Sequence, residues 1–107
     1  MADVKQLYKE AFGAFARGDL DAAVESYKTV VEAEPGFSLA WQGLAEVYGR
    51  RDQLDLAIEA IQKAIEAAPD ESLYYTSLSR FLQRQGKIPE AEAAAMEAQR
   101  VQARGGA

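Results

Sequence analysis

One spacing organises this sequence, and it is the separation of Pro35 from Pro69 along the chain. A small residue recurs at the same 34-residue spacing as Ala23, Ala57 and Ala91. Further sets in the same register are Leu7, Trp41 and Tyr75; Leu20, Leu54 and Ile88; Val30, Ala64 and Ala98; Ala11, Ala45 and Ser79; and Gly18, Asp52 and Gly86. Such a repeat predicts stacked units that share one core, and about three copies are needed for stability. The 107 residues hold three copies.

Within each repeat the apolar residues indicate helices. Val4, Leu7, Tyr8, Ala11 and Phe12 recur at intervals of three and four residues, which places them on one face of a helix. Turn residues such as those at 17–19, 34–36, 51–52, 68–70 and 85–87 interrupt the pattern. The sequence therefore predicts six helices, over 4–17, 20–33, 38–50, 54–67, 72–85 and 89–103.

Capping residues support these boundaries. Asp19 and Asp52 precede predicted helix starts, and Ser38 and Ser72 stand where an N-cap hydroxyl would accept hydrogen bonds from free backbone amides. Pro89 falls in a first turn, where its missing N–H has no cost.

The composition excludes several kinds of chemistry. The chain has no His and no Cys, so zinc sites built from these residues, disulfides and Ser-His or Cys-His catalysis are absent. Its carboxylate pairs, such as Asp19 with Asp21 or Glu90 with Glu92, lie at helix starts, where they complement the helix dipole. The sequence predicts a protein that is not an enzyme and that binds no cofactor and no metal.

Net charge and hydropathy limit the kinds of partner that the sequence predicts. Seventeen acidic residues against 12 basic ones give a net charge of −5, which argues against a nucleic-acid partner. No run approaches the roughly 18 apolar residues of a membrane span, and the first residues have no signal-peptide pattern. We therefore predict a cytoplasmic protein with no membrane partner.

Segment 41–48 of the middle copy reads Trp-Gln-Gly-Leu-Ala-Glu-Val-Tyr and is followed by Ala57, Ile61, Ala64 and Pro69. This pattern resembles that of the tetratricopeptide repeat family. The first copy departs from the pattern at Glu10 and Ala14, and the third lacks the final Pro. The resemblance implies an all-α fold, a right-handed α-solenoid of three helix-turn-helix repeats in which Trp41 and Tyr48 belong to the core.

The resemblance also implies a single domain, 1–107, divided into repeats at about 4–37, 38–71 and 72–105. In the last helix, Glu92, Ala95 and Gln99 replace the apolar residues of earlier copies, so we expect this helix to act as its own cap. The alternatives are that this end packs on another subunit, or that the chain comes from a longer array.

In this family the first helix of each repeat lines a concave groove. The predicted peptide-binding residues are Lys5, Tyr8, Lys9, Phe12, Phe15, Leu39, Gln42, Gly43, Glu46, Arg50, Leu73, Thr76, Ser77, Arg80 and Arg84. Five of these are basic and one is acidic, whereas most acids of the chain fall on the second helices. The prediction is a basic, aromatic groove with an acidic back.

Three features of the groove stay open at this stage. Phe12 and Phe15 either face a partner or turn into the core of the atypical first copy. The Lys and Arg residues of the groove either select acidic side chains of a partner or form an ordinary solvated face. Gly43 and Gly49 lie inside a predicted helix at a cost of about 1 kcal/mol each, which we interpret as giving a ligand backbone close access. The alternative for Gly49 is that it eases the end of the helix before Arg51 and Asp52.

These features predict a non-catalytic interaction module, an adaptor that binds an apolar and acidic segment of another protein, either a short peptide or a helix. The alternative is a small dedicated chaperone or assembly factor that forms a homodimer. The carboxylate clamp that other family members use for Hsp70 and Hsp90 tails is absent, because the matching positions hold Tyr8, Phe12, Gly43, Leu73 and Ser77.

Overall fold

The computed structural model describes residues 3–105, and its secondary structure is helical. The helices are α1 (Val4–Ala16), α2 (Leu20–Ala33), α3 (Ser38–Arg50), α4 (Leu54–Ala67), α5 (Ser72–Arg84) and α6 (Ile88–Gly105). No strand occurs between residues 3 and 105. The predicted all-α fold is confirmed, and each predicted boundary lies within two residues of the observed one.

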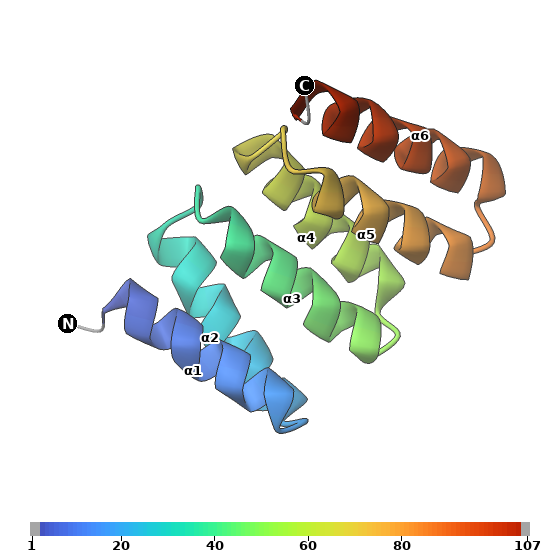
Figure 1. Ribbon diagram of the computed structural model, residues 1–107. Helices are drawn as coiled ribbons and strands as arrows, with labels where there is room; N and C mark the ends of the chain where they lie inside the picture. The colour runs from blue at the N-terminus through green and yellow to red at the C-terminus, as the bar shows by residue number, and fades with distance from the viewer. Residues whose placement is uncertain (1–2, 106–107) are drawn as a thin grey trace.

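The helices form three hairpins that stack in chain order (Figure 1). Each helix packs most extensively against its hairpin partner, and α2 and α4 also pack against the first helix of the next hairpin. The stack of helices measures 41 × 31 × 20 Å. We call the surface made by α1, α3 and α5, which faces the viewer in Figure 1, the front face; α2 and α4 lie behind it and form the back.

The turn inside each hairpin requires a left-handed residue. Gly18, Asp52 and Gly86 have φ angles of 81°, 61° and 79°. Each is followed by a residue whose N–H returns to a carbonyl of the helix end, as from Asp19 N to Ala14 O at 2.8 Å. This is the Schellman arrangement, which satisfies free carbonyls at a helix C-terminus. The shared geometry explains why these three positions keep the register of the repeat.

The helix starts partly differ from the predicted caps. Asp19 caps α2, because its side chain accepts a hydrogen bond from Ala22 N at 3.3 Å. Ser38 and Ser72 are the first residues inside α3 and α5, so their assignment as caps is wrong. Glu71 caps α5 instead, and the Ser38 hydroxyl accepts a hydrogen bond from Tyr74 Oη at 3.1 Å. Asp52 is also not a cap, since it occupies the left-handed turn position.

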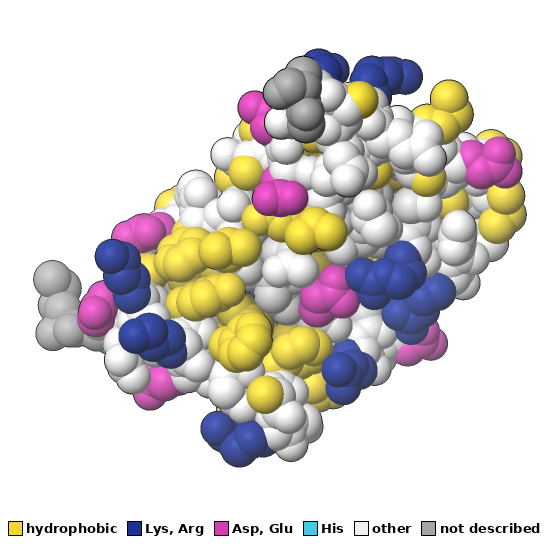
Figure 2. Space-filling model, viewed as in Figure 1, with side chains coloured by type: hydrophobic (Ala, Val, Ile, Leu, Met, Phe, Trp, Pro, Cys, Tyr) yellow, Lys and Arg dark blue, Asp and Glu magenta, His cyan; other side chains and the backbone are white. Residues whose placement is uncertain are grey.

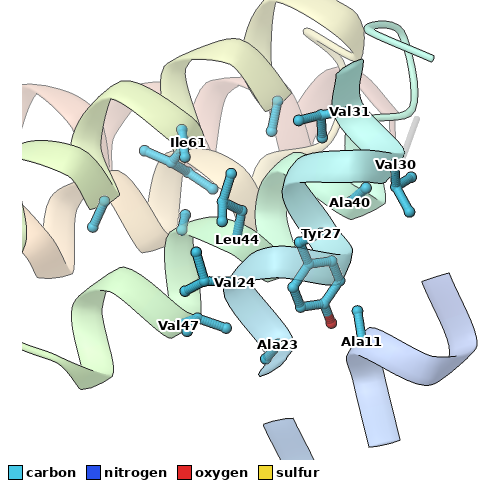
Figure 3. Close-up of a cluster of buried hydrophobic side chains, with 14 of the residues drawn as sticks. Ala11, Ala23, Val24, Tyr27, Val30, Val31, Ala40, Leu44, Val47 and Ile61 are labelled. Carbon is cyan, nitrogen blue, oxygen red and sulfur yellow. The ribbon is translucent and has the colours of Figure 1, made fainter. Parts of the chain in front are cut away.

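Small residues let the helices approach closely in the core. Ala11, Ala23, Ala45, Ala57 and Ala91 are all fully buried, as the repeat predicts. Larger side chains fill the space around these contacts, and Tyr27 of α2 is the largest of them that is almost completely buried. Figure 3 shows its ring extending from α2 toward Ala11.

The same hydrogen bonds recur between successive repeats. Trp41 donates its indole N–H to Pro35 O at 2.7 Å, and Tyr75, the equivalent residue of the next repeat, donates its hydroxyl to Pro69 O at 3.3 Å. The two aromatic residues thus attach the start of α3 and of α5 to the preceding turn. This explains why an aromatic residue and a proline recur together.

The face of α6 that corresponds to the buried face of α2 carries Glu92, Ala95 and Gln99. Glu92 and Gln99 are exposed and Ala95 is half-buried, whereas the corresponding residues of α2, Val24, Tyr27 and Val31, are buried against α3. The role of α6 as a cap stays a prediction. None of the helices within residues 3–105 combines the length and apolar character that a membrane span requires.

Candidate functional site

The front face presents its side chains in rows. Because the repeat keeps one length, equivalent positions on α1, α3 and α5 lie side by side: Lys5, Leu39 and Leu73 form one row, and Phe12, Glu46 and Arg80 form another. The predicted groove residues therefore come together on one surface, although they come from three separate helices of the chain.

Hydrophobic side chains cross this face as a continuous area (Figure 2). Phe12, Leu39 and Leu73, one from each front helix, are 58%, 49% and 64% exposed. Tyr8 and Phe15 are half-buried beside them and pack against the core. We call these five residues the apolar strip. Phe12 thus points outward, and Phe15 contributes both to the surface and to the core.

Phe37 supports the strip and was missed from the sequence. Its ring stacks on Tyr8, with centroids 5.1 Å apart and an interplanar angle of 28°. Tyr8 in turn meets Tyr27 edge-on at 5.9 Å. Phe37 falls outside the repeat pattern, where Asp3 and Glu71 stand in the other repeats, so the repeat carried no signal for it.

Burial changes the acidity of two of these tyrosines. Desolvation raises the pKa of Tyr27 to about 12, and the nearby Tyr8 adds to the shift. Desolvation, and secondly the proximity of Tyr74, also raises the pKa of Tyr8. Both hydroxyls are therefore protonated at neutral pH, and Tyr8 adds no negative charge to the apolar strip.

Two of the predicted basic residues join α3 to α5. Arg80 binds both carboxylate oxygens of Glu46, at 3.3 and 2.8 Å, and Ser77 donates to the same carboxylate at 3.4 Å. Arg84 donates to Gly49 O and to the Asp52 carboxylate, each at 3.0 Å. These contacts cross from one repeat to the next and use side chains that were predicted to bind a partner.

The other predicted residues remain on the surface to different degrees. The Arg50 guanidinium lies over the Phe15 ring, 4.9 Å from its centroid. Lys5 and Lys9 are exposed on α1, and Thr76 is exposed on α5, whereas Gln42 is half-buried on α3. Figure 2 shows basic side chains on both sides of the hydrophobic area.

The interpretation of the two helix glycines is wrong. A Cβ on Gly43 would collide with the Tyr27 ring, and one on Gly49 would lie 2.7 Å from a Phe81 ring atom. The space above each glycine is thus filled by an aromatic ring of the protein itself, and a ligand backbone has no access. Ser77 is also buried, with 6% of its surface exposed, so neither Gly43 nor Ser77 offers contact area to a partner.

We predict opposite effects for alanine at two helix glycines. Gly43→Ala forces the buried Tyr27 ring to move, an overpacking cost of about 1–3 kcal/mol that outweighs the roughly 1 kcal/mol gained in helix propensity. Gly13→Ala is the control, because its Cβ meets only the exposed end of Arg17 at 3.3 Å. Urea denaturation followed by circular dichroism should show a loss for the first and a small gain for the second. Equal stability of both variants would contradict the packing described above.

The back of the molecule has a hollow of its own. It has a volume of about 260 Å³ and lies over α3 between α2 and α4. Trp41, Leu44 and Tyr48 are among its lining residues. Trp41 and Tyr48, expected in the core, are only partly buried, although they do pack against it. Two lysines and two glutamates border the hollow, so it carries no net charge.

Comparisons with known proteins agree with this geometry. The sequence profile of the tetratricopeptide repeat matches residues 14–81. No curated protein sequence matches the chain.

Several solved structures share the fold. SycD, a type III secretion translocator chaperone from Yersinia enterocolitica, aligns with a TM-score of 0.90 and 24% identity over 94% of this chain and 76% of its own. MamA aligns with a TM-score of 0.94 and 21% identity over 97% of this chain and 61% of its own. The first tetratricopeptide repeat domain of Spaghetti (RPAP3), bound to an HSP90 peptide, aligns at 0.87 with 17% identity, over 92% of this chain and 78% of its own. At these identities the likeness establishes the architecture alone.

Proposed function

The chain belongs to the tetratricopeptide repeat family, and from this premise we propose that it is a non-catalytic interaction module whose front face binds a short segment of a partner protein. The observation that carries the proposal is the apolar strip. Six large hydrophobic side chains are exposed between residues 3 and 105, and three of them, Phe12, Leu39 and Leu73, gather on this one face. Exposed apolar residues that cluster in this way mark interaction surfaces.

The strip has the features of a binding hot spot. Aromatic side chains with basic neighbours are the usual anchors of protein interfaces. Phe12 offers an exposed ring, and the stacked pair of Tyr8 and Phe37 holds the surface beside it in place. A partner that covers these side chains gains about 25 cal/mol for each Å² of apolar surface removed from water.

Solved complexes of proteins with a similar fold support the proposal that this fold binds peptide segments. One solved structure contains SycD with a peptide of the translocator YopD, and the Spaghetti domain is bound to the HSP90 peptide SRMEEVD. For this chain we propose a different recognition chemistry. The five positions of the carboxylate clamp hold Tyr8, Phe12, Gly43, Leu73 and Ser77, so a partner is bound by apolar contacts and not through a clamped terminal carboxylate.

The test compares two pairs of exposed residues. Partners are captured by crosslinking in the source cell, and their affinities are measured for the wild type, for Phe12→Ala with Leu73→Ala, and for Leu56→Ala with Ile88→Ala. The second pair is also exposed but lies on α4 and α6. We expect the front-face variant to bind at least tenfold more weakly, as for loss of a hot spot, and the control to bind as the wild type does. Unchanged binding by the front-face variant would contradict the proposal.

A second candidate is a small dedicated chaperone, which we propose on the likeness in fold and size to SycD. Such a protein shields a long client segment and self-associates, and the apolar strip is available for both roles. Light scattering over a range of concentrations separates the two candidates, because a stable dimer supports the chaperone and a strict monomer supports the adaptor.

A further inference from the structure

The five basic residues of the front face fall into two groups. Arg80 and Arg84 already have carboxylate partners within the protein: Glu46 lies 2.8 Å from Arg80, and Asp52 lies 3.0 Å from Arg84. Within residues 3–105, no carboxylate forms an ion pair with Lys5, Lys9 or Arg50. The number of basic residues on this face therefore overstates the positive charge that α5 offers a partner.

The unpaired cations are all associated with α1. Lys5 and Lys9 stand on α1 itself, and Arg50 of α3 lies over Phe15, near the C-terminal end of α1. They border the stretch of the apolar strip that contains Tyr8, Phe12 and Phe15. At the α5 end of the strip, Leu73 occupies the position that Lys5 occupies on α1.

The two groups differ in what an incoming carboxylate would meet. An acid that approaches Arg80 must displace Glu46, which already binds the guanidinium through both oxygens, and it must approach close to that negative charge. An acid that approaches Lys5 or Lys9 displaces no carboxylate, because neither lysine forms an ion pair within residues 3–105. The positive charges beside α1 are therefore free to attract an acidic side chain of the partner. Those of α5 are already largely neutralised by carboxylates of the protein itself.

We infer that the partner segment is acidic where it lies along α1 and apolar where it crosses α3 and α5, and that Lys5, Lys9 and Arg50 set this preference. Arg80 and Arg84 hold α5 to α3 and do not select residues of the partner. The inference rests on the proposed binding function and adds to it the chemistry and the placement of the partner. It also replaces the prediction that Arg80 and Arg84 belong to the peptide-binding residues.

The experiment uses a displayed library of random peptides about 15 residues long, a length that spans the front face when extended or helical. The library is selected on the full chain in four forms: wild type, Lys5→Gln with Lys9→Gln, Arg80→Gln with Arg84→Gln, and Phe12→Ser. The two double variants each remove two positive charges, so net charge alone cannot separate them. Peptides from the wild-type selection are then synthesised, and their affinities are measured at low and high salt.

We expect wild-type peptides to combine apolar residues with an excess of Asp and Glu. The lysine variant should lose the acidic excess, keep the apolar preference, bind the wild-type peptides about tenfold more weakly and show a flatter salt dependence. The arginine variant should keep the acidic excess and bind within about twofold of the wild type, but unfold at a lower temperature, because the α3–α5 contacts are lost.

Two outcomes would overturn the inference: a wild-type selection without acidic excess, or an excess that disappears in the arginine variant and persists in the lysine variant. Failure of the proposed function looks different. In that case Phe12→Ser selects the same peptides as the wild type, or no peptide is enriched by either of them.

Discussion

Phe81→Ala is expected to destabilise the protein by about 3–5 kcal/mol, which is a large share of the roughly 5–15 kcal/mol that typical domains have in total. Phe81 is completely buried and lies directly over Gly49, so its ring fills the space between α5 and α3. Removal of the ring leaves a cavity that neighbouring side chains cannot fill, because the residue facing it is a glycine. Urea denaturation, followed by the fluorescence of Trp41, measures the loss.

Phe12→Ala is the matched control for this prediction. The same atoms are removed from a side chain that is 58% exposed, so the stability should change by about 0.5 kcal/mol or less. A similar loss for both variants would mean that Phe12 belongs to the core, and it would remove the main support for a binding strip. A loss of less than about 1 kcal/mol for Phe81→Ala would contradict the packing of α5 on α3.

Stability is expected to fall steeply between pH 10 and pH 12 because of Tyr27. Its pKa is about 12 in the folded chain and near 10 when it is exposed to water. The folded state therefore holds this proton more tightly than the unfolded state does. The contribution of Tyr27 to the free energy of unfolding is complete below pH 10 and is lost as the pH rises through 12. Two pKa units correspond to about 2–3 kcal/mol. Denaturation curves at a series of alkaline pH values measure the change.

Tyr27→Phe isolates this effect from the other alkaline titrations. The variant keeps the ring over Gly43 but has no proton to lose, so it should resist the alkaline loss by the amount assigned to Tyr27. Ultraviolet absorbance should show a tyrosine that ionises near pH 12 in the wild type and that is missing from the variant. Parallel loss of stability in the wild type and the variant would show that Tyr27 is not the cause.

The register of the repeat predicted most of the fold. Helix boundaries followed from local patterns, because apolar periodicity and turn residues act within a few positions. The buried alanines Ala23, Ala57 and Ala91 were identifiable for the same reason, as each repeat places its small residue at the same helix contact. The caps at Ser38 and Ser72 were wrong by one position, since the preceding residues Phe37 and Glu71 have the non-helical backbone of a cap.

The candidate site was predicted less completely. The register located Phe12, Leu39 and Leu73 on one face, but it did not reveal that Tyr27 occupies the space above Gly43. One pairing was within reach of the sequence: Glu46 and Arg80 stand at equivalent positions of successive repeats, and opposite charges so placed lie side by side on α3 and α5. The contact between Arg84 and Asp52 joins positions that are not equivalent in the repeat, so it carried no such signal.

The sequence by itself determined the repeat, the helices and the face on which the aromatic and basic residues stand. Only the tertiary structure decided which of those residues a partner can reach. Phe12, Lys5 and Lys9 are exposed to solvent, whereas Gly43 is covered by the Tyr27 ring. The physical reason is the range of the interactions. Helix formation and amphipathic faces depend on neighbours in the chain, whereas burial and charge pairing depend on side chains from other repeats, whose positions become known only when the helices are packed.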